Sequence, residues 1–313
     1  MFVDKFLSHT ESRKKPDTYK NRKVSLNQFT EYIDSYPIET INDVESYHIE
    51  DWIDDLLLDG YARRSIRSKV YDLSAYFAYA DNRNWVKQNP VDTVDIKDFK
   101  TPEIDKHTKI RYLSIEEFKK LLNVCHKLRD ELLVRLIWDT GVRASEAVSI
   151  KIEDIDRDNK KISVKNGKRS RDKDHERRDV YYSNALEGLL YRWIDRGERL
   201  SYLGVEDKTG HLLVTKQGSR MATTRVSKLV RELAKDAEIQ EVLYTDQSGR
   251  PRNKVTPHAL RHSFAVHRVK KGMPIAYLQD LMGHTEIEVT RDYLKFREDD
   301  VRQAAEHYQP DLD

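Results

Sequence analysis

A stretch near the end of the first third of the chain breaks the helical periodicity around it and divides the sequence in two. Residues 89–114, NPVDTVDIKDFKTPEIDKHTKIRYLS, hold two prolines and scattered polar residues without a sustained hydrophobic period. Such a stretch is typical of a connection between domains. The chain has 313 residues, more than a single hydrophobic core usually serves. We therefore expect a first domain over 1–95, a linker over 96–107 and a second domain over 108–313.

The first domain is predicted to be helical, mainly over residues 16–80. In IEDWIDDLLLDG, apolar side chains recur at i, i+3, i+4, i+7 and i+8, which is the spacing of one helix face. These side chains are Ile49, Trp52, Ile53, Leu56 and Leu57, and Gly60 is the expected helix stop. A second such face comprises Ile66, Val70, Leu73 and Phe77. We interpret both faces as core packing.

The second domain is predicted to combine helices with a small antiparallel sheet. Ser114 followed by Glu117 in LSIEEFKKLL has the pattern of a capping box, so a helix should begin there. The next helix, DELLVRLIWDT, should end at Gly141. Three short β-prone runs follow, KKISVK, RRDVYYS and HLLVTK, before helices resume at 222–237 and 258–271. The expected fold class is mainly α with a small antiparallel β-sheet.

Composition leaves the nature of the binding partner open. The chain carries 56 Lys and Arg against 54 Asp and Glu, a net charge of +2, whereas nucleic-acid binders are often far more basic. Basic residues nevertheless cluster at 13–15, 20–23 and 63–69. A DNA partner is therefore permitted but not required by composition.

Two further features bear on location and redox chemistry. The first residues, MFVDKFLSHTESRKK, lack an apolar core of signal-peptide length, so we expect a cytoplasmic protein without a membrane partner. Cys125 is the only cysteine, which excludes an intrachain disulfide and a cysteine-based metal cluster. Its Leu and Val neighbours favour a small buried apolar role over a reactive thiol.

Four short motifs in the second domain carry residues suited to phosphate chemistry. They are TGVRASE at 140–146, HALRHSF at 258–264, LMGH at 281–284 and TRDYLKF at 290–296. The residues of interest in them are Arg143, His258, Arg261, His284 and Tyr293. Each motif alone is a weak signal, because single charged residues mostly occupy solvated surfaces.

In combination, the four motifs resemble the catalytic domain of tyrosine recombinases, the phage-integrase and Xer-type family. In that family an arginine follows a threonine-glycine turn, a His-x-x-Arg begins a later helix, and a histidine follows a glycine. The nucleophilic tyrosine lies nine residues beyond that histidine, as Tyr293 lies nine beyond His284 here. The resemblance covers roughly 105–300 with specific motifs. Over 10–95 it is looser, and the NPVD segment is similar to the end of the family's SAM-like core-binding domain. It implies a two-domain fold, a helical core-binding domain followed by a mixed α/β catalytic domain.

The chemistry implied by the resemblance agrees with the residue types. Attack on a phosphodiester builds negative charge on two nonbridging oxygens, which the guanidinium groups of Arg143 and Arg261 can bind in a fork. His284 would donate to the same oxygens, and His258 would exchange a proton with the attacking phenol. Attack by Tyr293 would give a 3′-phosphotyrosyl bond and a free 5′-hydroxyl, so no cofactor or metal is expected.

The leaving 5′-oxygen needs a proton, and the family supplies it from a lysine on the β-hairpin. Here the hairpin KKISVKNGKRSRDKDHERRDVYYS has a longer and more charged tip than the usual compact form. Lys168 is the first choice by its offset of 25 residues from Arg143, Lys165 is the second and Lys173 the third.

The resemblance implies a site-specific DNA recombinase that cuts and rejoins strands, with double-stranded DNA as its partner. A homo-tetramer on paired sites and accessory DNA-bending proteins are the further implied partners. The extended hairpin favours integration or excision of a mobile element, a virus or plasmid, and Xer-type chromosome or plasmid dimer resolution is the alternative. A type IB topoisomerase, a telomere resolvase and a non-catalytic DNA-binding protein stay as rival interpretations. In a C-terminal segment, Val301, Ala304, Ala305 and Tyr308 have helical spacing. The resemblance implies that this helix docks on a neighbouring protomer, and packing on its own domain is the alternative.

Several remaining residues have structural interpretations. The acidic run IEDIDRD, 152–158, is compatible with a metal-dependent nuclease, but its position between a helix and a strand favours turn formation. Glu146 is expected to support the start of a helix and not to act as a base. His262 is left open between the site and packing. His175, His211 and His267 are expected to be structural.

Overall fold

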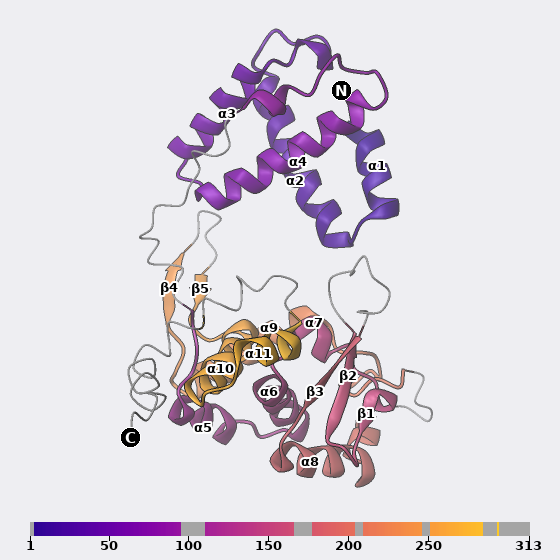
Figure 1. The fold of residues 1–313 in the computed structure, drawn as a ribbon, viewed down its shortest axis with the longest axis vertical. Helices are drawn as coiled ribbons and strands as arrows, with labels where there is room; N and C mark the ends of the chain where they lie inside the picture. The colour runs from indigo at the N-terminus through magenta and orange to yellow at the C-terminus, as the bar shows by residue number, and fades with distance from the viewer. Residues whose placement is uncertain are drawn as a thin grey trace, which may run out of the picture. The chain divides into compact units, whose positions relative to one another are not determined.

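The computed structural model describes residues 3–94, 110–165, 177–203, 209–245 and 251–283, together with Tyr293. The chain forms two compact units, Met1–Thr108 and Lys109–Asp313, and each is described by itself (Figure 1). The predicted linker, 96–107, lies outside the described residues.

Over its described residues, 3–94, the first unit has four helices and two short 3₁₀ turns. They are α1 (Val3–Arg13), α2 (Pro16–Ile33), η1 (Ile41–Asp43), α3 (Ser46–Leu58), α4 (Arg63–Asp81) and η2 (Pro90–Thr93). The two predicted apolar faces lie in its core, with Trp52 and Phe77 almost wholly buried. The prediction of helices is confirmed, and α1 extends it, because Phe6 and Leu7 also enter this core.

The NPVD segment belongs to the core of this unit. The Asn89 side chain accepts a hydrogen bond from the Val91 amide over 3.1 Å, which begins the turn η2, and Pro90 and Val91 are buried. The beginning of the irregular stretch 89–114 therefore packs on the first unit, because its two apolar residues are covered there.

In the second unit, the described elements pack around the buried helix α6 (Leu128–Thr140). Its helices are α5 (Ile115–Asn123), α6 (Leu128–Thr140), α7 (Ala144–Ala147), α8 (Asn184–Leu190), α9 (Thr223–Asp236), α10 (Pro257–Lys270) and α11 (Ile275–Met282). Shorter helical turns are η3 (Ile152–Asp154), the π-helical η5 (Tyr191–Asp195) and η6 (Glu198–Tyr202). Most of α6 is buried, including Leu132, Leu133, Leu136 and Ile137 at 0% exposure, so this helix is the centre of the core.

Two predicted helix boundaries are confirmed. The Ser114 hydroxyl accepts from the Glu117 amide over 3.1 Å, and the Glu117 carboxylate accepts from the Ser114 amide over 2.8 Å, which is the capping box of α5. Helix α6 ends at Gly141, whose φ of 65° lies in the left-handed region that favours glycine.

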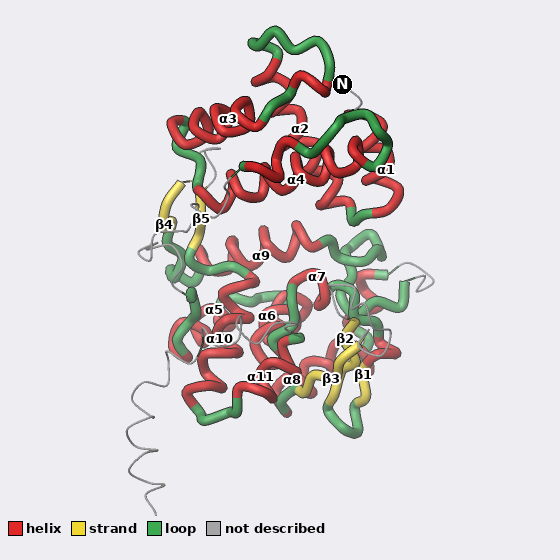
Figure 2. The backbone as a smooth tube through the Cα atoms, turned by 45° about the horizontal axis from the view of Figure 1, so that its top comes forward, coloured by secondary structure: helices red, strands yellow, loops and turns green. Residues whose placement is uncertain are grey.

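The sheet of the second unit has three antiparallel strands in the order β1 (Ile155–Asp156), β2 (Lys161–Lys165), β3 (Arg177–Tyr181). Figure 2 shows these strands at one side of the helices. In the register Ile162 pairs with Val180, and both are buried. A separate hairpin, β4 (Val242–Thr245) and β5 (Pro251–Asn253), was not predicted.

One strand prediction is wrong. The run HLLVTK contributes no strand to this sheet and forms only single bridges, Lys151 with His211 and Val214 with Arg220. Its residues 212–214 are nevertheless fully buried. A short continuous apolar run predicts that its side chains are buried, but it does not show whether its backbone pairs with another strand. The strand prediction was wrong for that reason. The fold class, mainly α with a small antiparallel sheet, is confirmed.

Candidate active site

The turn after α6 places Arg143 at the N-terminus of α7. A Cβ atom on Gly141 would lie 2.5 Å from Cδ1 of Phe264, so the turn requires glycine both for its φ and for the close approach of α10. The amide of Arg143 donates to Glu146 Oε2 over 2.8 Å, and its Nη1 donates to Glu146 Oε1 over 2.8 Å. The side chain is 32% exposed, so part of the guanidinium remains accessible.

Arg261 lies on α10 and is buried to 1% exposure. Its Nη1 donates to the Gly141 carbonyl over 2.5 Å, and its Nη2 donates to the Met282 carbonyl over 2.6 Å. One guanidinium thus joins the turn after α6, helix α10 and the last turn of α11. A cation held by backbone carbonyls of two other segments has a fixed position, which is what electrostatic preorganisation requires.

His258 and the two arginines line one cavity of about 320 Å³. The cavity lies between the start of α7, the start of α10 and the hydroxyl side chains Thr223 and Ser227 of α9. Burial, with the nearby charges of Arg261 and Arg143, lowers the pKa of His258 below its ordinary value, so the ring is neutral near pH 7. Two cations and a neutral imidazole around a small cavity make a binding site for an anion.

Glu146 is the counter-ion of this arrangement. Its burial raises the pKa, but the hydrogen bond and charge of Arg178 and the contacts of Arg143 outweigh burial and lower the pKa to about 2. The carboxylate also lies 3.8 Å from Nη1 of Arg261. Its bond to the Arg143 amide confirms the expected support of a helix start.

Arg178 was missed by the sequence analysis. It lies on β3, its Nη2 donates to Glu146 Oε2 over 2.8 Å, and its Nε donates to the Leu281 carbonyl over 2.9 Å. A signal was available: Arg178 precedes the buried Val180 by two positions, so both point to the same face of the strand. An arginine on the inward face of a strand predicts a buried acidic partner.

Tyr293 is buried to 2% exposure, and its hydroxyl lies 2.5 Å from Nδ1 of His262. The His262 ring in turn packs edge-on against the His258 ring, with centroids 4.2 Å apart. Within the described residues, neither Tyr293 nor His262 lines the cavity of His258. The structure therefore brings Tyr293 beside the site through His262, one helical turn beyond His258 on the same face of α10.

Three of the predicted site residues lie outside the described part of the chain. These are Lys168, the alternative Lys173, and His284. Lys165, the other alternative, ends β2 and lines a second cavity of about 240 Å³ together with Glu146 and Arg177. The predicted C-terminal helix, with Val301 to Tyr308, is also outside the described residues.

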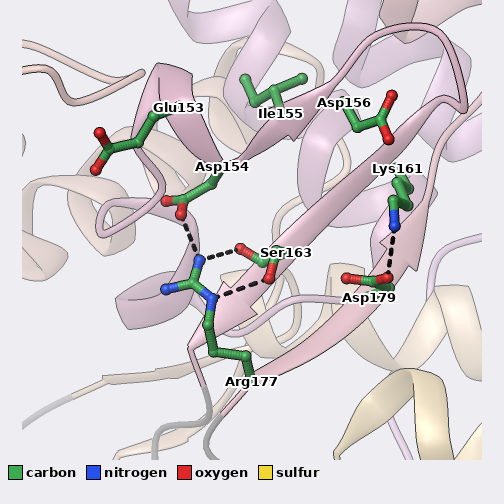
Figure 3. A pocket seen from close by; sticks show the side chains of 8 residues that line it. All are labelled: Glu153, Asp154, Ile155, Asp156, Lys161, Ser163, Arg177 and Asp179. Atoms are coloured by element: carbon green, nitrogen blue, oxygen red, sulfur yellow. Dashed lines mark hydrogen bonds and ion pairs between the residues drawn. The ribbon is translucent and has the colours of Figure 1, made fainter.

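Acidic side chains of the run 152–158 form hydrogen bonds with other groups of the protein. Asp154 accepts from Arg177 (Figure 3). Asp154 also accepts from the Lys151 amide, and Asp156 accepts from the Asn159 amide over 3.0 Å. Expected turn formation is thus confirmed. Within the described ranges, no group of three or more His, Cys, Asp or Glu side chains could hold a metal ion.

Cys125 and His267 have hydrogen-bond partners in the fold. Burial, with nearby Asp130 and Glu131, raises the pKa of Cys125 to about 12, and its Sγ donates to the Leu121 carbonyl. Nε2 of His267 lies 2.8 Å from the Leu113 carbonyl oxygen, and His211 is partly buried. His175 lies outside the described residues. No helix in the described part of the chain is long and apolar enough to span a membrane.

Comparison with known proteins identifies relatives over nearly the whole chain. Tyrosine recombinase XerA of Pyrococcus furiosus is 30% identical over 250 residues, which are 79% of this chain and 75% of that protein. Tyrosine recombinase XerA of Thermococcus kodakarensis is 27% identical over 285 residues, 90% of this chain and 88% of that protein.

Solved structures share the fold. The XerH site-specific recombinase bound to palindromic difH substrate has a TM-score of 0.72 at 20% identity, over 97% of this chain and 83% of that chain. The Tn1549 transposon integrase in complex with a circular intermediate DNA also has a TM-score of 0.72, at 18% identity over 98% of both chains. The profile of the Phage integrase SAM-like domain matches residues 1–100, and that of the Phage integrase family matches 111–299. The chain therefore belongs to the Phage integrase family and is a tyrosine recombinase.

Proposed function

We propose that this protein is a site-specific DNA recombinase that cleaves and rejoins strands through a 3′-phosphotyrosyl intermediate. The observation that carries the proposal is the cavity lined by Arg143, His258 and Arg261. The His258 ring packs against His262, whose Nδ1 contacts the Tyr293 hydroxyl. A phosphodiester in that cavity would meet two guanidiniums at its nonbridging oxygens, where charge develops during attack.

The reaction needs groups that bind the nonbridging oxygens, a nucleophile, and an acid for the leaving oxygen. Arg143 and Arg261 bind the nonbridging oxygens, and His284 adds a donor to them. The Tyr293 oxygen attacks phosphorus, the bond to the 5′-oxygen breaks, and a hairpin lysine protonates that oxygen. Lys168 is the first candidate for this acid, before Lys165 and Lys173, because of its offset from Arg143. The energy of the broken linkage is kept in the phosphotyrosyl bond, so a 5′-hydroxyl can reverse the reaction without a cofactor.

His258 is suited to a neutral role in the cavity. Its lowered pKa leaves a ring that can donate to a phosphate oxygen or exchange a proton at neutral pH. A fully charged imidazolium would instead compete with the two arginines for the same counter-ions.

Double-stranded DNA with a specific recombination site is the proposed substrate, held by both units. The related XerH structure is described as bound to its difH substrate, and the Tn1549 integrase as bound to circular intermediate DNA. The proposed domains are a core-binding domain over 1–95 and a catalytic domain over 108–313, joined by a linker over 96–107; the division of the chain into two compact units after Thr108 supports two domains. Basic clusters at 13–15 and 63–69 would contact phosphates, which gives salt-dependent affinity without sequence information. A DNA substrate of this kind would place the protein on DNA in the cytoplasm.

The decisive experiment traps the covalent intermediate. Genomic or plasmid fragments that become covalently attached to the protein first identify the DNA site. A duplex with this site and a nick beside the cleaved position then serves as the substrate. The nick lets the short cleaved strand diffuse away, so the covalent intermediate accumulates. A denaturation-resistant adduct should form with the unmodified protein and not with Tyr293→Phe. Adduct formation by that variant would overturn the assignment of the nucleophile. Abolition of cleavage by EDTA would favour a metal-dependent nuclease.

Integration or excision of a mobile element is the proposed biological role. The long hairpin tip between β2 and β3 supports it, as does the structural likeness to a transposon integrase. Xer-type dimer resolution is the second candidate, because the relatives named XerA align over most of their length. Deletion of the gene separates the two: loss of an excised circle indicates the element, and accumulation of chromosome or plasmid dimers indicates resolution.

A homo-tetramer on two paired sites is the proposed active assembly, with accessory DNA-bending proteins as further partners. Deleting residues 299–313 should remove the predicted docking helix. Pairing of two DNA sites should then fall more than binding to one site. A gel shift that resolves the complex with one DNA site from the complex with two sites measures both. Unchanged recombination by the shortened chain would contradict this assembly.

A further inference from the structure

We propose that His262 is the group that holds the Tyr293 hydroxyl and accepts its proton when the phenol oxygen attacks phosphorus. This inference rests on the proposed function, and it assigns the proton transfer to a different histidine from the one that the motif pattern favours. The contact between Nδ1 of His262 and the hydroxyl, at 2.5 Å, is its starting observation.

The position of His262 is set by a rigid element. Helix α10 begins with the Thr256 hydroxyl accepting from the Ala259 amide over 3.1 Å, and the helix packs against the buried α6. The neighbouring Arg261 is held by two backbone carbonyls. An imidazole on such a helix has a fixed position beside the phenol, which is the geometry that a general base needs.

The phenol is enclosed with this imidazole. Tyr293 is 2% exposed and packs in the cluster that contains Phe264, Ala265 and Leu278. A tyrosine hydroxyl has an ordinary pKa near 10, so attack at neutral pH needs an acceptor for its proton. Nδ1 of His262 is in direct contact with the hydroxyl and can accept that proton without a bridging water when the ring carries its own proton on Nε2.

The other candidate bases are less well placed. The described ring contact of His258 is with His262, and it is His262 whose Nδ1 lies 2.5 Å from the hydroxyl. The Glu146 carboxylate is occupied by Arg143 and Arg178, and their hydrogen bonds lower its pKa, which makes it a poor proton acceptor. His262 is therefore the base that the contacts favour, and His258 is left to face the phosphate.

The step balances without an added reactant. The O–H bond of Tyr293 breaks and its proton passes to Nδ1 of His262, which becomes an imidazolium. The phenol oxygen forms a bond to phosphorus, the bond from phosphorus to the 5′-oxygen breaks, and that oxygen takes a proton from the hairpin lysine. In rejoining, the imidazolium returns its proton to the departing phenol oxygen.

Two variants of His262 test the role. His262→Phe removes the acceptor, and His262→Asn keeps a polar group near the Nδ1 position that can hydrogen-bond but cannot take a proton. Single-turnover adduct formation on the nicked substrate, with saturating protein, should fall about 100-fold or more in both variants. Gel-shift affinity for the same DNA should stay near the unmodified value, because neither variant removes a phosphate contact.

Replacing the phenol distinguishes a base from a packing residue. When Tyr293 is exchanged for 3,5-difluorotyrosine, the hydroxyl is more acidic and depends less on an acceptor. The loss caused by His262→Asn should then shrink at least about 10-fold relative to the loss with ordinary tyrosine, since general-base assistance falls with the acidity of the donor. His267→Phe, on the same helix and bonded to the Leu113 carbonyl, is the control: any loss it causes should be equal for the two phenols.

The outcomes separate this inference from the proposed function. If the unmodified protein forms no adduct, the proposed function fails. If it forms the adduct and His262→Phe and His262→Asn keep its rate, or if their losses are equal for both phenols, the assignment of His262 is overturned. Should His262→Phe fail to fold, His262→Asn alone gives the comparison.

Discussion

Nη2 of Arg178 lies 2.8 Å from Oε2 of Glu146, and the two side chains are 8% and 1% exposed. The pair joins strand β3 to the start of α7, and the second contact of Arg178, to the Leu281 carbonyl, joins both to the last turn of α11. Arg261 binds the adjacent Met282 carbonyl. Two guanidiniums therefore hold the negative end of α11, from which the chain continues toward position 284.

Replacing Arg178 with methionine should destabilise the protein. Removing one partner of a buried ion pair leaves the other charge without compensation, and we expect a loss of about 3 kcal/mol, at the low end because Arg143 still binds Glu146. Urea unfolding of the full chain measures this loss. The matched control is Arg177→Met on the same strand, whose side chain is 43% exposed and should cost less than about 1 kcal/mol. Equal effects of the two variants would argue against a special role for the buried pair.

The stability that Glu146 supplies should disappear in acid. Its folded-state pKa of about 2 lies below the ordinary value of 4.5, so the unfolded chain takes up the proton first as the pH falls. The contribution is fully present above about pH 4.5 and is lost as the pH falls through about 2. The difference between the unfolded and folded pKa values corresponds to about 3 kcal/mol of folding free energy. The free energy of unfolding of Glu146→Gln should therefore approach that of the unmodified protein over this range, while the exposed-site control Glu153→Gln keeps the unmodified pH dependence.

Alanine at position 141 should cost more than a conformational penalty. The left-handed φ costs about 1–2 kcal/mol for a residue with a side chain, and displacement of the Phe264 ring adds overpacking, so we expect about 3 kcal/mol in all. Gly272→Ala is the control, because its φ of 81° carries the same backbone cost and no atom lies within 4 Å of the new Cβ. Thermal unfolding compares the two. Adduct formation should fall only in Gly141→Ala, since the Gly141 carbonyl holds Arg261.

The proton donor to the leaving group can be found by changing that group. With a bridging sulfur in place of the 5′-oxygen, the leaving thiolate is stable unprotonated, because thiols ionise near pKa 8.5. Lys168→Met should lose adduct formation on ordinary DNA, by about 100-fold, and recover it on the sulfur substrate. Lys165→Met and Lys173→Met should show no such recovery. Recovery by Lys165→Met instead would transfer the role to the end of β2, beside Glu146.

Local features of this protein could be predicted from the sequence because they depend on neighbouring residues. The capping box of Ser114 and Glu117 and the helix end at Gly141 each involve residues within one turn. The apolar faces with Trp52 and Phe77 follow from helical periodicity alone. The spacing of the four motifs likewise identified the family, which the comparison with relatives confirmed.

Contacts between distant segments were decided only by the tertiary structure. Arg178 and Glu146 are 32 residues apart, and His262 and Tyr293 are 31 apart. The run HLLVTK was predicted as a strand, yet its apolar side chains are buried without ladder pairing. Periodicity reports which face of an element is covered, but the identity of the covering group depends on how the elements pack against one another. For that reason the sequence alone predicted the residue types of the site, and the packing of α7, β3, α10 and α11 determined which of them touch.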